Sequence, residues 1–201
     1  LSAEPSENGT SWTIRLRQGV SFHDGTPFNA EAVVHHWQRL LDPANGYRGR
    51  YLIKPIKSVE KVDEHTVRFH LQHPWIIFPR ILASARGAMT SIPSPTGVSD
   101  GRQHRTPVGT GPFMFKEWRS ADRFVVVRNP GYWQQGKPCL DQIVFRFMPD
   151  HQTRYAALEA EDVDMIWMDR GRHVRKAMED PGLKVYHSED NGAEIIILNT
   201  S

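Results

Sequence analysis

The stretch WTIRLRQGVSFHDGTPFNAEAVVHHWQRLLD, residues 12–42, decides the fold because it predicts a strand, a loop and a helix in succession. Apolar and polar residues alternate over 12–16, which is typical of a half-buried strand. Turn-forming residues fill 23–27 and indicate a tight loop. Asn29 is a good helix N-cap, and apolar residues then recur at helical spacing over 30–41. The order strand, loop, helix is the nucleus from which the rest of the chain can be placed.

The remainder of the chain also mixes strands with helices. The expected elements are a hairpin over 56–71, a short helix after Pro79, a loop over 92–105, strands over 113–118, 124–127, 143–147, 163–167, 183–186 and 195–198, and helices over 150–160 and 172–178. We find no internal repeat and no low-complexity tract. The predicted fold class is therefore α/β in the broad sense, a mixed α+β arrangement.

Composition excludes several classes of protein. The 201 residues carry 25 Lys+Arg and 23 Asp+Glu, a net charge of +2, which argues against a nucleic-acid binder. Cys139 is the single cysteine, so neither an internal disulfide nor a cysteine-rich zinc site can form. No apolar run is long enough to cross a bilayer, so we expect no membrane insertion of this segment. Residues 1–10 are polar and begin without Met, so we expect a processed or cut chain.

No pattern in the sequence predicts catalysis or a metal site. His35 and His36 are adjacent on the predicted helix and point about 100° apart, so they cannot chelate one ion. His23 and Asp24 fit a turn in which the aspartate bonds its own backbone. The glycines of 109–111 lack the other residues of a phosphate loop, and we expect them to let the backbone turn tightly. We therefore predict no enzyme activity, no metal and no cofactor.

Two downstream blocks complete the pattern that begins with residues 12–42. They are PVGTGPF at 107–113 and RNPGYW at 128–133. In this order, the three blocks closely resemble the family 5 extracellular solute-binding proteins of ABC importers, the peptide- and nickel-binding group. The resemblance extends over nearly the whole chain.

The resemblance implies a type II periplasmic binding protein-like fold of which this chain forms most of the first lobe only. Residues 1–95 would form the outer subdomain of that lobe. Residues 96–201 would form part of its inner, hinge-bearing subdomain, with the second lobe absent. By the same mapping, 198–200 would lie where the first lobe crosses into the second.

The resemblance also implies a function, the capture of a small ligand for import. A short peptide is the first expectation, and a nickel–chelator complex is the alternative. The partners would be that ligand and an ABC permease, and the location would be periplasmic or lipid-anchored on the extracellular face. Two other classes remain open: a sensory or regulatory module that reuses the fold, and a hydrolase suggested only by His23 and Asp24.

Four residues are candidate ligand contacts. Arg86 follows an apolar segment, and an arginine there can hold a ligand carboxylate with two hydrogen bonds. It resembles the arginine that holds chelate carboxylates in nickel-binding members, although Ala85 and Gly87 replace the flanking prolines. Tyr47, Arg48 and Arg50 lie in the loop after the first predicted helix, and such loops often carry ligand contacts.

Overall fold

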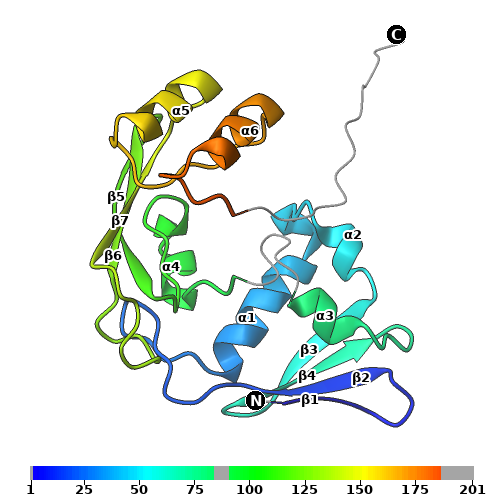
Figure 1. Ribbon diagram of the computed structural model, residues 1–201. Helices are drawn as coiled ribbons and strands as arrows, with labels where there is room; N and C mark the ends of the chain where they lie inside the picture. Colours follow the sequence, from blue (N-terminus) through cyan, green and yellow to red (C-terminus); the bar gives the residue numbers. More distant parts are fainter. Residues whose placement is uncertain (1, 84–90, 187–201) are drawn as a thin grey trace. The chain divides into compact units, whose positions relative to one another are not determined.

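The computed structural model describes residues 2–83 and 91–186 (Figure 1). Contacts divide the chain into two compact units, Leu1–Arg146 and Phe147–Ser201, and each is described by itself. The boundary expected near residue 95 concerns subdomains within a lobe, and it stays a prediction.

A four-stranded antiparallel sheet forms the base of the first unit. Its order is β1-β2-β4-β3, and its strands are β1 (Ser2–Pro5), β2 (Ser11–Arg15), β3 (Ile56–Asp63) and β4 (Thr66–Leu71). The predicted strand and hairpin are confirmed, whereas β1 was not predicted because its four residues show no alternation of apolar side chains. Trp12 pairs with Phe69 across β2 and β4, which places both rings on the apolar face.

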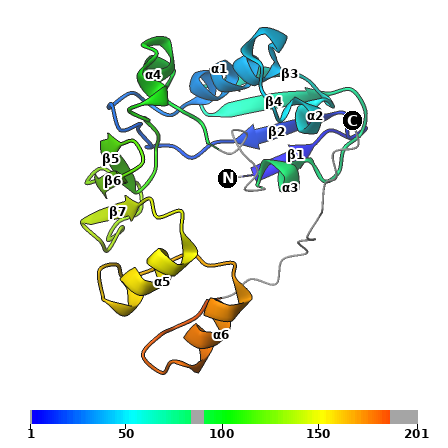
Figure 2. The same ribbon diagram turned by 90° about the horizontal axis from the view of Figure 1, so that it is seen from above.

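Helix α1 (Ala30–Leu41) packs on that apolar face (Figure 2). The Asn29 side chain accepts a hydrogen bond from the Ala32 amide, so the predicted N-cap is confirmed. The ring of Trp37 lies edge-on to Phe69, with centroids 5.2 Å apart, and Phe78 of α3 (Phe78–Leu82) lies 5.0 Å from Phe69. These three rings are almost fully buried and form the centre of the core.

Short helical segments connect the larger elements. After α1, the Asp42 side chain caps η1 (Pro43–Asn45), Gly46 adopts a left-handed conformation, and α2 (Arg50–Ile53) follows. Residues predicted as loop contain α4 (Pro95–Ser99) and η3 (Arg102–His104), so that prediction is wrong. The signal was present: Ser94 caps α4, and Pro95 occupies its first turn, where proline is favoured.

A second antiparallel sheet completes the first unit. Its order is β5-β6-β7, with β5 (Phe113–Arg119), β6 (Arg123–Arg128) and β7 (Gln142–Arg146). Phe115 pairs with Val126, and Phe124 pairs with Phe145, so these side chains share one face. All three strands were predicted within two residues.

The second unit contains two helices, α5 (His151–Glu159) and α6 (Gly171–Glu179). Asp150 caps α5 as predicted. The predicted strands over 163–167 and 183–186 are wrong, because neither segment is a strand or pairs with one within residues 2–83 and 91–186. Arg154 of α5 instead binds the carbonyl of Trp167 at 2.7 Å. The predicted strand over 195–198 lies outside the described residues.

Candidate functional site

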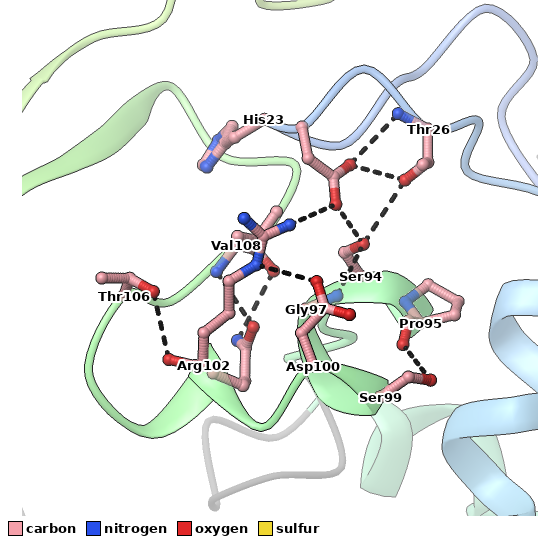
Figure 3. Close-up of polar contacts among 12 residues, drawn as sticks. His23, Thr26, Ser94, Pro95, Gly97, Ser99, Asp100, Arg102, Thr106 and Val108 are labelled. Carbon is pink, nitrogen blue, oxygen red and sulfur yellow. Dashed lines mark hydrogen bonds and ion pairs between the residues drawn. The ribbon is translucent and has the colours of Figure 1, made fainter.

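The first sequence block meets the segment 94–102 in the first unit at a polar junction, which comprises His23, Asp24, Thr26, Ser94 and Arg102 (Figure 3). The loop before α1 supplies the first three residues. Ser94 supplies the cap of α4, and Arg102 begins η3. Segments some 70 residues apart in sequence are therefore joined through one carboxylate.

Asp24 is the centre of this junction, and its side chain is 13% exposed. One carboxylate oxygen accepts hydrogen bonds from the hydroxyl and the amide of Thr26, at 2.6 and 3.1 Å. The other accepts a hydrogen bond from the Ser94 hydroxyl at 2.6 Å and lies 3.9 Å from an Arg102 nitrogen. Hydrogen bonds to an ionised acceptor are short and strong, which matches these distances.

The environment favours the ionised form of Asp24. Burial alone raises the pKa of this carboxyl, but the hydrogen bonds from Ser94 and Thr26 and the charge of Arg102 outweigh burial, so its pKa lies below the usual 3.8. The carboxylate therefore stays charged at neutral pH, and its low pKa makes it a weak proton acceptor.

His23 links the same loop to the second block. Its Nε2 lies 2.9 Å from the carbonyl of Gly111, and its Nδ1 accepts a long hydrogen bond of 3.4 Å from the amide of Gly109. Asn129, the second residue of the third block, donates to the Gly111 carbonyl at 3.0 Å. All three blocks therefore converge around 109–111, which the sequence alone did not reveal.

The backbone bends over 110–112, but its conformation does not require glycine at 109 or 111. Neither Gly109 nor Gly111 has a positive φ, and an added Cβ at either position would meet no atom within 4 Å. Gly25 is different, because its φ of 82° lies in the left-handed region that disfavours other residues. The turn that needs glycine is thus the one beside Asp24.

The junction is built to hold the chain in place. Its carboxylate, its hydroxyls and the ring of His23 all bond one another or the backbone. Ser94 is fully buried, so no substrate could reach its hydroxyl without displacing Asp24. The arrangement matches the structural role expected for His23 and Asp24 and gives the hydrolase alternative no nucleophile at this place.

A hollow of about 530 Å³ lies beside the junction, between the end of α1 and the face of the second sheet. Its apolar wall includes Leu40, Ile92, Phe113, Phe115, Phe124 and Val126. Its polar lining includes His23, Arg39, Asn45, Tyr47 and Gln103. A size of 300–1,000 Å³ and a mainly apolar lining with few polar groups are typical of small-molecule sites.

The predicted site residues fall in different places. Tyr47 lines the hollow and is half-buried, whereas Arg48 and Arg50 are exposed and are not among its lining residues. Arg86 lies outside the described residues. Burial, with a smaller effect from Tyr51, raises the pKa of the Tyr47 hydroxyl, so it stays protonated at neutral pH and can donate a hydrogen bond.

Sequence reasoning missed the other lining residues. Arg39 lies in the last turn of α1, where a basic residue is ordinary. Phe115 and Phe124 belong to correctly predicted strands, and their positions in that hairpin indicated a shared apolar face. What covers that face could not be read from the pattern.

Among residues 2–83 and 91–186, no group of three or more His, Cys, Asp or Glu is arranged to hold a metal ion. In the same described ranges, the helices are too short or too polar to cross a membrane.

The whole chain, residues 1–201, matches the sequence model described as bacterial extracellular solute-binding proteins, family 5 middle. The glutathione-binding protein GsiB of Shigella flexneri is 40% identical over 166 residues, which cover 81% of this chain and 31% of that protein. GsiB of Escherichia coli K12 is also 40% identical, over 162 residues. The chain thus spans 31% of the length of these curated relatives.

Solved structures give the same result. The binding protein AgaA of A. tumefaciens R10, in complex with agropinic acid, is 30% identical with a TM-score of 0.82, over 90% of this chain and 36% of that one. DppA of Helicobacter pylori, with the peptide STSA, is 28% identical with a TM-score of 0.77, over 90% and 39%. NikA of Brucella suis, with Fe(III)-EDTA, is 28% identical with a TM-score of 0.76, over 89% and 36%.

Proposed function

This chain belongs to family 5 of the bacterial extracellular solute-binding proteins, and we propose that it forms part of the substrate-binding component of an ABC importer that captures a short peptide. The predicted fold class is confirmed, since the mixed helix-and-sheet chain matches periplasmic binding proteins over 36–39% of their length. In the proposal, ligand binds between two lobes that close by a hinge motion. The closed form then meets a membrane permease, at a periplasmic or lipid-anchored location.

The observation that carries this proposal is the match over residues 1–201, together with relatives that bind glutathione, itself a small peptide. The peptide complex of the H. pylori protein supports the same ligand class. The structure adds an apolar hollow beside a hydrogen-bonded polar junction, a combination suited to holding a ligand.

The test is calorimetry on the full-length protein with glutathione, a set of tripeptides and tetrapeptides, and a nickel chelate. We expect micromolar or tighter binding of at least one peptide, and much weaker binding by residues 1–201 alone, because the second wall of the cleft is missing. The proposal fails if the full-length protein binds no peptide. It also fails if mass spectrometry shows that the protein cleaves the peptides it binds.

A metal chelate is the second candidate. The similarity to the B. suis protein with Fe(III)-EDTA favours it, because a chelated metal brings its own ligands. Nickel–chelate binding with no peptide binding in the same calorimetry would select this candidate over the first. An Arg86→Ala variant that binds every carboxylate ligand with unchanged affinity would remove the predicted role of Arg86.

A further inference from the structure

The hollow contains a cation that no described residue neutralises. Arg39 is half-buried, and in residues 2–83 and 91–186 its side chain takes part in no hydrogen bond or ion pair. Other arginines of the first unit have carboxylate partners: Arg123 lies 3.0 Å from Glu117, and Arg128 lies 2.9 Å from Asp141. Arg15, Arg48 and Arg50 have no carboxylate partner among the described residues either, but they are exposed, so Arg39 differs from them in being half-buried.

The lining of the hollow offers Arg39 no counter-charge. None of its lining residues is Asp or Glu. The side-chain amides are already engaged, because Gln103 bonds the backbone of Val108 and Asn45 donates to Asp42 at 3.2 Å. Besides the hydroxyl of Ser91 and the rings of His23 and His36, the lining offers a ligand the guanidinium of Arg39 and the protonated hydroxyl of Tyr47, both hydrogen-bond donors.

The apolar wall strengthens the attraction between these donors and an anionic ligand. Phe113, Phe115 and Phe124 replace water on one side of the hollow. Attraction between opposite charges grows as the surroundings become less polar. A cation partly removed from water therefore gains more from an anionic partner than an exposed cation does. The negative partial charge at the C-terminal end of α1 attracts the guanidinium only weakly. It explains why a basic residue is tolerated here, but it does not supply a partner.

We propose that this hollow binds a carboxylate-bearing ligand, with Arg39 and Tyr47 holding the carboxylate and the three phenylalanines contacting an apolar part of the ligand. A guanidinium matches a carboxylate with two parallel hydrogen bonds, which makes arginine the suitable residue. The inference rests on the proposed function and deepens it by naming the residues and the chemical group recognised. Glutathione, the peptide STSA and EDTA, which the similar proteins bind, all carry carboxylates.

The experiment uses the full-length protein and two matched probes, a tripeptide containing phenylalanine as the free acid and the same tripeptide with an amidated C-terminus. Binding of both is measured for wild type, Arg39→Gln, Arg39→Lys and the control Arg15→Gln, whose exposed side chain lies on β2 away from the hollow. We expect Arg39→Gln to weaken binding of the acid at least tenfold, Arg39→Lys to weaken it less, and the control to leave it unchanged. The amide should bind wild type and Arg39→Gln equally, which also shows that the variant folds.

Three outcomes overturn the inference. The first is wild-type affinity of Arg39→Gln for the acid, and the second is an equal loss for acid and amide, which would mark a structural role. The third is a crystal structure of the full-length protein in which another part of its own chain fills the hollow. In all three, peptide binding by wild type would leave the proposed function standing. If wild type binds neither tripeptide nor glutathione, the proposed function fails and the inference fails with it.

Discussion

The polar junction and the hollow lie side by side in the first unit, yet they treat charge in opposite ways. Asp24 accepts three hydrogen bonds and lies near a guanidinium, so its negative charge is stabilised by partners within the chain. Arg39 is half-buried with no partner among the described residues. A satisfied charge stabilises the fold, whereas an unsatisfied one beside an apolar wall is available to a ligand. Substitutions in the two regions should therefore affect different measurements.

The largest effect on stability is expected at the junction. Asp24→Ala leaves the hydroxyls of Ser94 and Thr26 without their acceptor, and we expect a loss of about 3 kcal/mol in the free energy of unfolding. Chemical denaturation of the full-length protein measures it. The control is Asp122→Ala, which removes an exposed carboxylate whose ion pair with Arg123 should contribute less than about 1 kcal/mol. Equal losses for the two variants would show that Asp24 contributes no more to stability than an exposed carboxylate does.

The hollow should show the reverse balance between stability and binding. Phe124 is only half-buried, so Phe124→Ala should cost about 1–2 kcal/mol of stability, less than a fully buried phenylalanine. Binding of a phenylalanine-containing peptide should weaken about tenfold, because the variant loses apolar contact with the ligand. Calorimetry provides the measurement, and Ile76→Ala, at a side chain 84% exposed, is the control. A large loss of stability with unchanged affinity would assign the hollow to the core.

Acid should lower the free energy of unfolding by protonating Asp24, an effect smaller than that of deleting its carboxylate. The pKa of Asp24 is lower in the folded chain than its usual value of 3.8, so its contribution to stability is complete above about pH 4 and is lost as pH falls through the lower folded value. Asp63 and Asp150 also have lowered pKa values, so wild type alone cannot isolate the effect. Between about pH 5 and pH 2, a range that spans the usual and the lowered pKa of Asp24, the free energy of unfolding of Asp24→Asn should fall less than that of wild type. Parallel curves for the two proteins would exclude the assigned role of Asp24.

The smallest effect is expected at the edge of the hollow. An added Cβ at Gly49 would overlap the ring and hydroxyl of Tyr47, which can move because it is the end of a side chain. Gly49→Ala should therefore change stability by less than about 1 kcal/mol while weakening peptide binding a few-fold. Gly171→Ala, where an added Cβ meets no atom within 4 Å, is the control. Unchanged binding in Gly49→Ala would mean that the position of Tyr47 is unimportant.

Much of the fold could be predicted because its signals are local. The cap at Asn29, the alternation in β2 and β4 and the cap at Asp150 each depend on neighbouring residues, and all three predictions are confirmed. The failures have a common cause. Residues 163–167 and 183–186 have the composition of strands, but a strand also needs a partner, and no local pattern reveals whether one is present. The prolines and glycines of 92–105 predict a loop, yet Ser94 and Pro95 occupy the cap and first turn of a helix there, where both residue types are also favoured.

The candidate site was less accessible to sequence reasoning. Tyr47 was predicted as a ligand contact and lines the hollow, but whether it touches a ligand stays a prediction, as do the roles of Arg48, Arg50 and Arg86. Arg39 looked like an ordinary basic residue at the end of a helix. Its importance emerges only when the surroundings of its side chain are known.

The sequence by itself determined the order of strands and helices, the helix caps and, through three short blocks, the resemblance to a family of ligand-capturing proteins. Only the tertiary structure brought Asp24 to Ser94 and placed Arg39 opposite the face of the second sheet. Local patterns depend on residues a few positions apart, whereas a site depends on which distant segments meet. That meeting is set by the packing of the whole unit and by the burial it imposes on each charge.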